Sequence, residues 1–251
     1  NTHEAGICKY CGTAFITEKV INNYTTNVVN KNNFYGANVT ITNTVDLKST
    51  IDMAKIALKS HDYVKADEHL STIKNNMPNG SEIISKIFEE ADILNWYKLI
   101  YNSNLSEARQ IFMRIEQYNA DDINIWLGVL EINNWAKDII VCGNNILRLT
   151  KTKEQHEKLV YTTYIEKEFS GEKAISNEHT VSAIPKEYVI KNTDFQNYIV
   201  DKCCSAIKSY KNNMAFSMIK EGIDILLETL PEDKRKIIES ELDKPAGGCY
   251  V

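Results

Sequence analysis

Two cysteines near the start of the chain are the residues best placed to do chemistry. Cys8 and Cys11 stand two residues apart in the stretch CKYCG, with Gly12 directly after them. This spacing forms a turn that presents both thiolates to one metal ion, and a tetrahedral zinc site needs four ligands. The pair therefore predicts half of a structural zinc site. An inert pair or a disulfide is the alternative, and His3 could add a third ligand or simply be a solvated terminal histidine.

The other cysteines and the histidines show no pattern of a catalytic or redox site. Cys203 and Cys204 are adjacent in a helical segment, so their side chains point about 100° apart and suit a buried core better than one shared metal. Cys142 is also expected in the core. Cys249 lies in an accessible GGC stretch, but no base is close to it in the sequence. The remaining histidines are expected on the surface: His61, His69, His156 and His179. A non-enzymatic protein is therefore expected.

Length, charge and cysteine content exclude several classes of protein. The chain has 251 residues and a formal net charge of -5, which gives no basic surface for nucleic acid. Six cysteines are too few for a disulfide framework, so a cytoplasmic location is favoured, with extracellular assembly left open. No run of about 18 apolar residues predicts a membrane span.

Residues 1–45 are predicted to hold the half zinc ribbon and a β segment. Thr, Val, Ile, Tyr and Phe alternate with Asn pairs, which is typical of short strands joined by turns. We expect strands at 14–21, 24–29 and 35–43. Lys31 is the only charged residue between Ile21 and Thr44.

From residue 46 onward the apolar spacing becomes helical, which predicts a mainly α fold. Helical hairpins are expected over 46–168, followed by a connector at 169–193, C-terminal helices at 194–244 and the start of a further module at 245–251. The hairpins repeat a small-large spacing about 42 residues apart. The packing residues that this spacing predicts are Ala66, Leu70, Ala108 and Phe112.

Three stretches resemble known families. CKYCGTAF with ITEKVINNYTT resembles the second knuckle of bacterial zinc-ribbon proteins, and DYVKADEHLSTIKNNMP resembles the second helix of a tetratricopeptide repeat. AGGCYV resembles the opening of the CFI-box, a short C-terminal module. The zinc-ribbon resemblance implies that Cys8 and Cys11 bind structural zinc in the full-length protein, with their partner ligands upstream. Together, the resemblances imply a chain truncated at both ends.

Two functions follow as expectations. The first is a non-enzymatic structural protein that assembles with other copies of itself into a filament, tube or ring. Its nearly uncharged strands would expose unpaired backbone groups that a neighbouring copy can bond. The self-association residues are expected to be Tyr24, Val28, Phe34, Tyr35, Val39 and Ile41. The alternative is a cytoplasmic adaptor that binds a partner peptide on its helical repeats.

Overall fold

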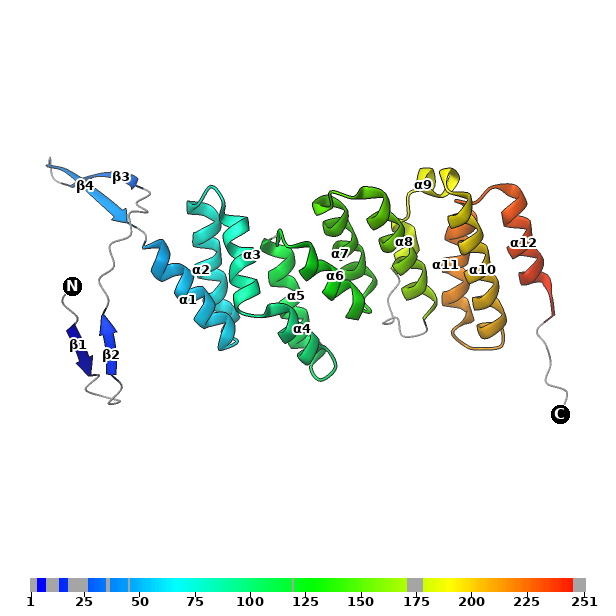
Figure 1. Cartoon of the computed structure of the whole chain (residues 1–251), viewed down its shortest axis with the longest axis horizontal. Coiled ribbons are helices and arrows are strands. Elements are labelled where there is room, and N and C mark those ends of the chain that lie inside the picture. Colours follow the sequence, from blue (N-terminus) through cyan, green and yellow to red (C-terminus); the bar gives the residue numbers. More distant parts are fainter. Residues whose placement is uncertain are drawn as a thin grey trace.

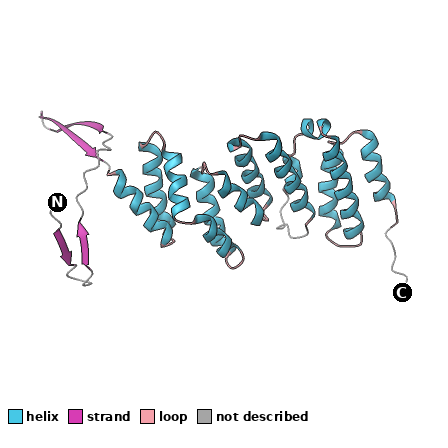
Figure 2. Ribbon diagram, viewed as in Figure 1, coloured by secondary structure: helices cyan, strands magenta, loops and turns pink. Residues whose placement is uncertain are grey.

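The computed structural model (Figure 1) describes four strands and most of the chain that follows them. The described residues are 4–7, 14–17, 27–34, 37–44, 46–118, 120–170 and 178–245. Figure 2 shows that helices dominate them, so the expected mainly α class is confirmed. Within these residues, no helix is both long and apolar enough to cross a membrane.

The strands form two separate antiparallel pairs. Strand β1 (Glu4–Ile7) pairs with β2 (Ala14–Thr17), and β3 (Asn27–Phe34) pairs with β4 (Ala37–Thr44). The strand ends differ from the expected ones. The asparagine-rich stretch after Val29 was expected to interrupt a strand, but β3 continues through it because each of its residues has a partner in β4.

The described helices follow one another with short connections. They are α1 (Leu47–Lys59), α2 (Tyr63–Asn76), α3 (Gly80–Glu90), α4 (Ile93–Tyr101), α5 (Leu105–Tyr118), α6 (Ile123–Ile132), α7 (Ala136–Leu149), α8 (Lys153–Phe169), the 3-10 helix η1 (Thr180–Ala183), α9 (Lys186–Lys191), α10 (Thr193–Tyr210), α11 (Phe216–Leu227) and α12 (Glu232–Asp243). Figure 1 shows them as a row in which α1 and α12 lie at opposite ends.

Neighbouring helices pack against each other along this row. Contacts join α1 to α2, α4 to α5, α6 to α7 and α10 to α11, while α2–α5 and α4–α6 contacts link successive pairs. The buried apolar side chains form one continuous core, from Ala54 in α1 to Ile238 in α12. Each helix therefore relies on its neighbours for burial, as in a stacked helical array.

The turn between α1 and α2 shows how the sequence closes a helix pair. His61 has a φ of 59°, a left-handed conformation that is uncommon for a residue with a Cβ. Its ring lies edge-on to Trp96 at 4.4 Å, and its Nδ1 lies 2.9 Å from Glu107 Oε1. Asp62 then caps α2 by accepting a hydrogen bond from the Lys65 N–H. The sequence SHDY, where a break was expected, thus reverses the chain.

Small side chains lie where the helices approach each other. Ala66 and Leu70 of α2 are completely buried, and Ala108 and Phe112 of α5 are almost so. A small residue lets two helix backbones come close, while the large residue one turn later fills the adjacent space. The structure therefore places all four in the core.

The prediction of a connector is wrong for its second half, which is folded and packed into the core. Residues 178–192 contain η1 and α9, and Thr180, Val181 and Val189 are buried. The Thr180 N–H donates to Glu168 Oε2 at 2.7 Å, and the Thr180 hydroxyl donates to the Tyr164 carbonyl at 2.7 Å. The sequence did not predict this packing for two reasons. Polar residues separate its short apolar stretches, and the segment is too short to show a helical period.

His179 also differs from its expected surface position. Its side chain is only 10% exposed, and it lies between two carboxylates. Nδ1 is 2.7 Å from Glu168 Oε1, and Nε2 is 3.2 Å from Glu221 Oε2. Because these groups come from α8, α11 and the segment before η1, the histidine ties three elements together.

Candidate peptide-binding groove

Helix α8 has two distinct faces. One face is buried and includes Val160, Tyr164 and Ile165. The opposite face carries Leu159, Thr163 and Glu166, which are spaced four and three residues apart and so lie in one row. Leu159, the first residue of this row, is a large apolar side chain that is 46% exposed.

A first hollow lies between this row and α6. Its volume is about 390 Å³. Leu127, Leu130 and Leu159 give it an apolar lining, and Glu131, Thr163, Glu166 and Lys167 supply its polar groups. A hollow with a leucine lining and a polar rim suits an apolar side chain that is attached to a hydrogen-bonding backbone.

Lys167 closes one end of the first hollow. Its ammonium donates to the Glu131 carbonyl at 2.9 Å and to Asn134 Oδ1 at 3.0 Å. The backbone carbonyls in the last turn of a helix have no partner within the helix, so a cation placed there satisfies one of them. Lys167 thus links α8 to the end of α6 beside the hollow.

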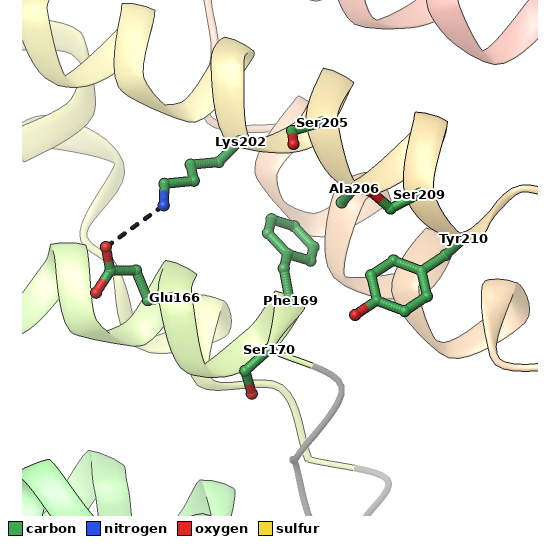
Figure 3. Close-up of a pocket in the computed structure, with 8 residues that line it drawn as sticks. All are labelled: Glu166, Phe169, Ser170, Lys202, Ser205, Ala206, Ser209 and Tyr210. Carbon is green, nitrogen blue, oxygen red and sulfur yellow. Dashed lines mark hydrogen bonds and ion pairs between the residues drawn. The ribbon is translucent and has the colours of Figure 1, made fainter.

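A second hollow lies on the other side of the row, between α8 and α10 (Figure 3). Its volume is about 360 Å³. Phe169 and Ala206 provide apolar surface, and most of the remaining lining groups are hydroxyls. The hydroxyl-bearing residues are Ser170, Ser205, Ser209 and Tyr210. Such groups can both donate and accept hydrogen bonds, as a peptide backbone requires.

Glu166 belongs to both hollows. It accepts a hydrogen bond from the Tyr198 hydroxyl at 3.0 Å, and the Lys202 ammonium lies 3.4 Å from the same carboxylate oxygen. Burial, and then the hydrogen bond to Glu166, raise the pKa of Tyr198, so the phenol stays a donor. Lys202 also lies over the Tyr198 ring, at 5.3 Å from its centroid. These contacts hold the shared wall of the two hollows in place.

A buried carboxylate anchors the inner side of α8. Glu168 is 1% exposed at its side chain and bonds His179 and Thr180. Gly222 of α11 allows this close approach, because a Cβ there would lie 3.0 Å from Glu168 Cγ. Helix α8, whose exposed face carries Leu159, Thr163 and Glu166, is therefore held in place at both its inner face and its C-terminal end.

The structure describes some of the residues predicted from the sequence and not others. Cys8, Cys11, Tyr24, Tyr35 and Cys249 lie outside the described residues, so the zinc assignment stays a prediction. Val28 and Phe34 lie in β3, and Val39 and Ile41 lie in β4. Among the described residues, no group of three or more His, Cys, Asp or Glu side chains could hold a metal ion.

Cys142 and Cys203 occupy the positions expected of core thiols, whereas Cys204 does not. Cys142 and Cys203 are buried, and burial raises the pKa of both thiols. Cys204 is partly exposed, and burial raises its pKa as well. A raised pKa keeps a thiol protonated and therefore poorly nucleophilic.

Sequence reasoning missed the groove itself. Its residues come from α6, α8 and α10, which are far apart in the chain, and serine or lysine on a helix is usually only a solvated residue. One signal was present, because Leu159 interrupts the polar face of an otherwise charged helix. The chain matches no protein-family model, no curated protein and no solved structure in the comparisons made. The three sequence resemblances therefore stay predictions.

Proposed function

We propose that this protein is a scaffold that binds a segment of a partner protein along the outer face of α8. The observation that carries the proposal is the pair of hollows on either side of Leu159 and Glu166. Stacked helical hairpins commonly bind extended peptides in this way, on a continuous surface built from several helices. We further propose that the hairpins are of the tetratricopeptide type.

The chemistry of the hollows specifies the kind of segment. The leucine lining near α6 would take one large apolar side chain, since burying it removes apolar surface from water. The serine and tyrosine hydroxyls near α10 would bond the backbone or polar side chains of the same segment. A peptide with one apolar anchor followed by polar residues therefore fits the groove.

A selection from a random peptide library on the immobilised full chain tests this proposal. Peptides enriched on the parent should be lost on the Leu159→Glu variant, because a carboxylate in the leucine lining would be desolvated by an apolar anchor. Val64→Glu is the matched control, since Val64 is another exposed apolar residue but lies on α2. Enrichment of the same peptides on both variants, or no enrichment on the parent, would contradict the proposal.

A second candidate is self-assembly through the strands. Among the described strands, β3 and β4 form a two-stranded sheet, so each strand has an outer edge that a strand of another copy could extend. The pairing of β3 with β4 leaves fewer free backbone groups than an unpaired segment would, yet it supplies a preformed edge.

Replacing both Val39 and Ile41 by lysine tests this second candidate. Charge on an edge strand opposes strand addition, so the double variant should lose any assembly of the parent while its helical content is unchanged. Light scattering and circular dichroism give the two readouts. A double variant that assembles as well as the parent would exclude the strands as the contact.

A further inference from the structure

Three hydroxyl groups on α10 line the second hollow without taking part in the fold. Ser205 and Ser209 lie one turn apart on the exposed side of α10, and Tyr210 follows directly. A serine or threonine within a helix often bonds the carbonyl four residues earlier, as Thr72 and Thr163 do in this chain. In the part of the chain that the structure describes, by contrast, the side-chain hydroxyls of Ser205, Ser209 and Tyr210 have no hydrogen-bond partner. These groups are therefore open to a ligand.

Two aromatic rings supply the apolar part of the same hollow. Phe169 at the end of α8 and Tyr210 at the end of α10 are both partly buried, and buried Ala206 lies among the lining residues (Figure 3). Among the described residues, neither ring stacks on another ring or lies edge-on to one. A ring that enters the hollow can therefore pack against them in the offset or edge-on arrangement that aromatic side chains favour.

The charged groups of this hollow cancel each other. Its lining contains one acid, Glu166, and one base, Lys202, and the two lie 3.4 Å apart. The Tyr198 hydroxyl bonds the same carboxylate oxygen. An anion in the hollow would face Glu166 while Lys202 is already paired, so a neutral ligand suits the hollow better.

We infer that the α8–α10 hollow takes an unphosphorylated tyrosine side chain of the bound segment, an inference that rests on the proposed function. The ring would pack against Phe169 and Tyr210, and its hydroxyl would bond Ser205 or Ser209. A buried tyrosine needs such a partner, because its hydroxyl loses its water on binding. Phenylalanine would leave the serine hydroxyls without a bond, whereas phosphotyrosine would place further negative charge beside Glu166. Since Glu166 also lines the first hollow, one short segment can place its apolar anchor there and its tyrosine here.

A random peptide library displayed on phage and selected on the immobilised full chain gives the first test. The enriched peptides should contain a tyrosine near an apolar anchor. The most enriched peptide is then synthesised with tyrosine, phenylalanine or phosphotyrosine at that position, and calorimetry measures the affinity of each form. The parent should favour tyrosine over phenylalanine by about fivefold, the value of one hydrogen bond between neutral groups, and should bind the phosphotyrosine form most weakly.

Variants of the hollow separate the hydroxyl groups from the rings. The double variant Ser205→Ala, Ser209→Ala should lose the preference for tyrosine but bind the phenylalanine peptide as the parent does, because alanine preserves the helix. Phe169→Ala should weaken both peptides, since it removes a ring against which either side chain would pack. Ser106→Ala changes an exposed serine on α5 and is the matched control, which should behave as the parent does.

The outcomes distinguish this inference from the proposed function. Enriched peptides that lack tyrosine but are lost on Leu159→Glu would overturn the inference alone. An unchanged preference for tyrosine in the double serine variant, or tighter binding of the phosphotyrosine peptide, would do the same. No enrichment on the parent, or enrichment of the same peptides on Leu159→Glu, would overturn the proposed function and the inference with it.

Discussion

Replacement of Arg109 by alanine is expected to lower the free energy of unfolding by about 3 kcal/mol, because it would leave a buried carboxylate without its cation. Asp138 of α7 is 1% exposed, and Arg109 of α5 is its ion-pair partner. The guanidinium also lies over the rings of Phe112 and Trp135, at 5.8 and 5.9 Å from their centroids. Urea unfolding of the two proteins measures the loss.

A double variant shows whether the loss of stability comes from the unpaired charge of Asp138. Arg109→Met with Asp138→Leu removes both charges, and it should recover most of the stability, because a buried ion pair is worth little more than an apolar pair of similar volume. Losses that simply add, with the double variant less stable than Arg109→Ala, would contradict this reading of the pair.

The same pair predicts a dependence on pH. Burial raises the pKa of Asp138, and it outweighs the lowering by Arg109. A carboxyl whose pKa is raised on folding binds its proton more readily in the folded state. Its contribution to folding stability is therefore present at low pH and is lost as the pH rises through the folded pKa. The cost of Arg109→Ala should therefore be smaller at about pH 4.5 than at about pH 7. A cost that is equal at both values would contradict the argument.

Replacement of Gly143 by valine is expected to cost about 3 kcal/mol, because the contact between α7 and α8 has no room for a side chain. A Cβ at this position would lie 1.9 Å from the Tyr164 hydroxyl oxygen and 2.7 Å from Val160 Cγ1. Tyr164 is buried and donates a hydrogen bond to the Ile140 carbonyl at 3.2 Å, so it cannot move without losing that bond. The melting temperature and urea unfolding report the loss.

The control for Gly143 lies one residue further along the same helix. Asn144 is exposed, so Asn144→Val should change stability by much less. Tyr164→Phe removes the hydroxyl oxygen that lies closest to the new Cβ, so it should partly rescue Gly143→Val. Equal stability of Gly143→Val and the parent would show that the two helices are not packed as described.

Local patterns predicted the helical hairpins but not the way that distant segments meet. The spacing of Ala66 and Leu70 indicated a buried face, and the break before Tyr63 indicated the turn at His61. These features depend on residues within one or two turns of helix. The zinc pair and the apolar strand residues fall in residues whose side chains the structure does not describe, so those predictions stand as they were made.

Tertiary contacts explain what sequence reasoning missed. His179 seemed a surface residue because its partners, Glu168 and Glu221, are 11 and 42 positions away. The segment 178–192 is too short for its periodicity to be read, yet α7, α8 and α11 pack against η1, and α10 packs against α9. The groove arises in the same way, since α6, α8 and α10 each contribute only part of its lining.

Photo-crosslinking of a selected peptide to the full chain, with its attachment sites mapped by mass spectrometry, tests the central claim most directly. The peptide would carry the photoreactive group at its apolar anchor. If the peptide binds in the groove, crosslinks should map to residues around the leucine lining on α6 and α8, and they should be lost in Leu159→Glu but not in Val64→Glu. Crosslinks concentrated on α1, on α12 or on the strands, and unchanged by Leu159→Glu, would contradict it.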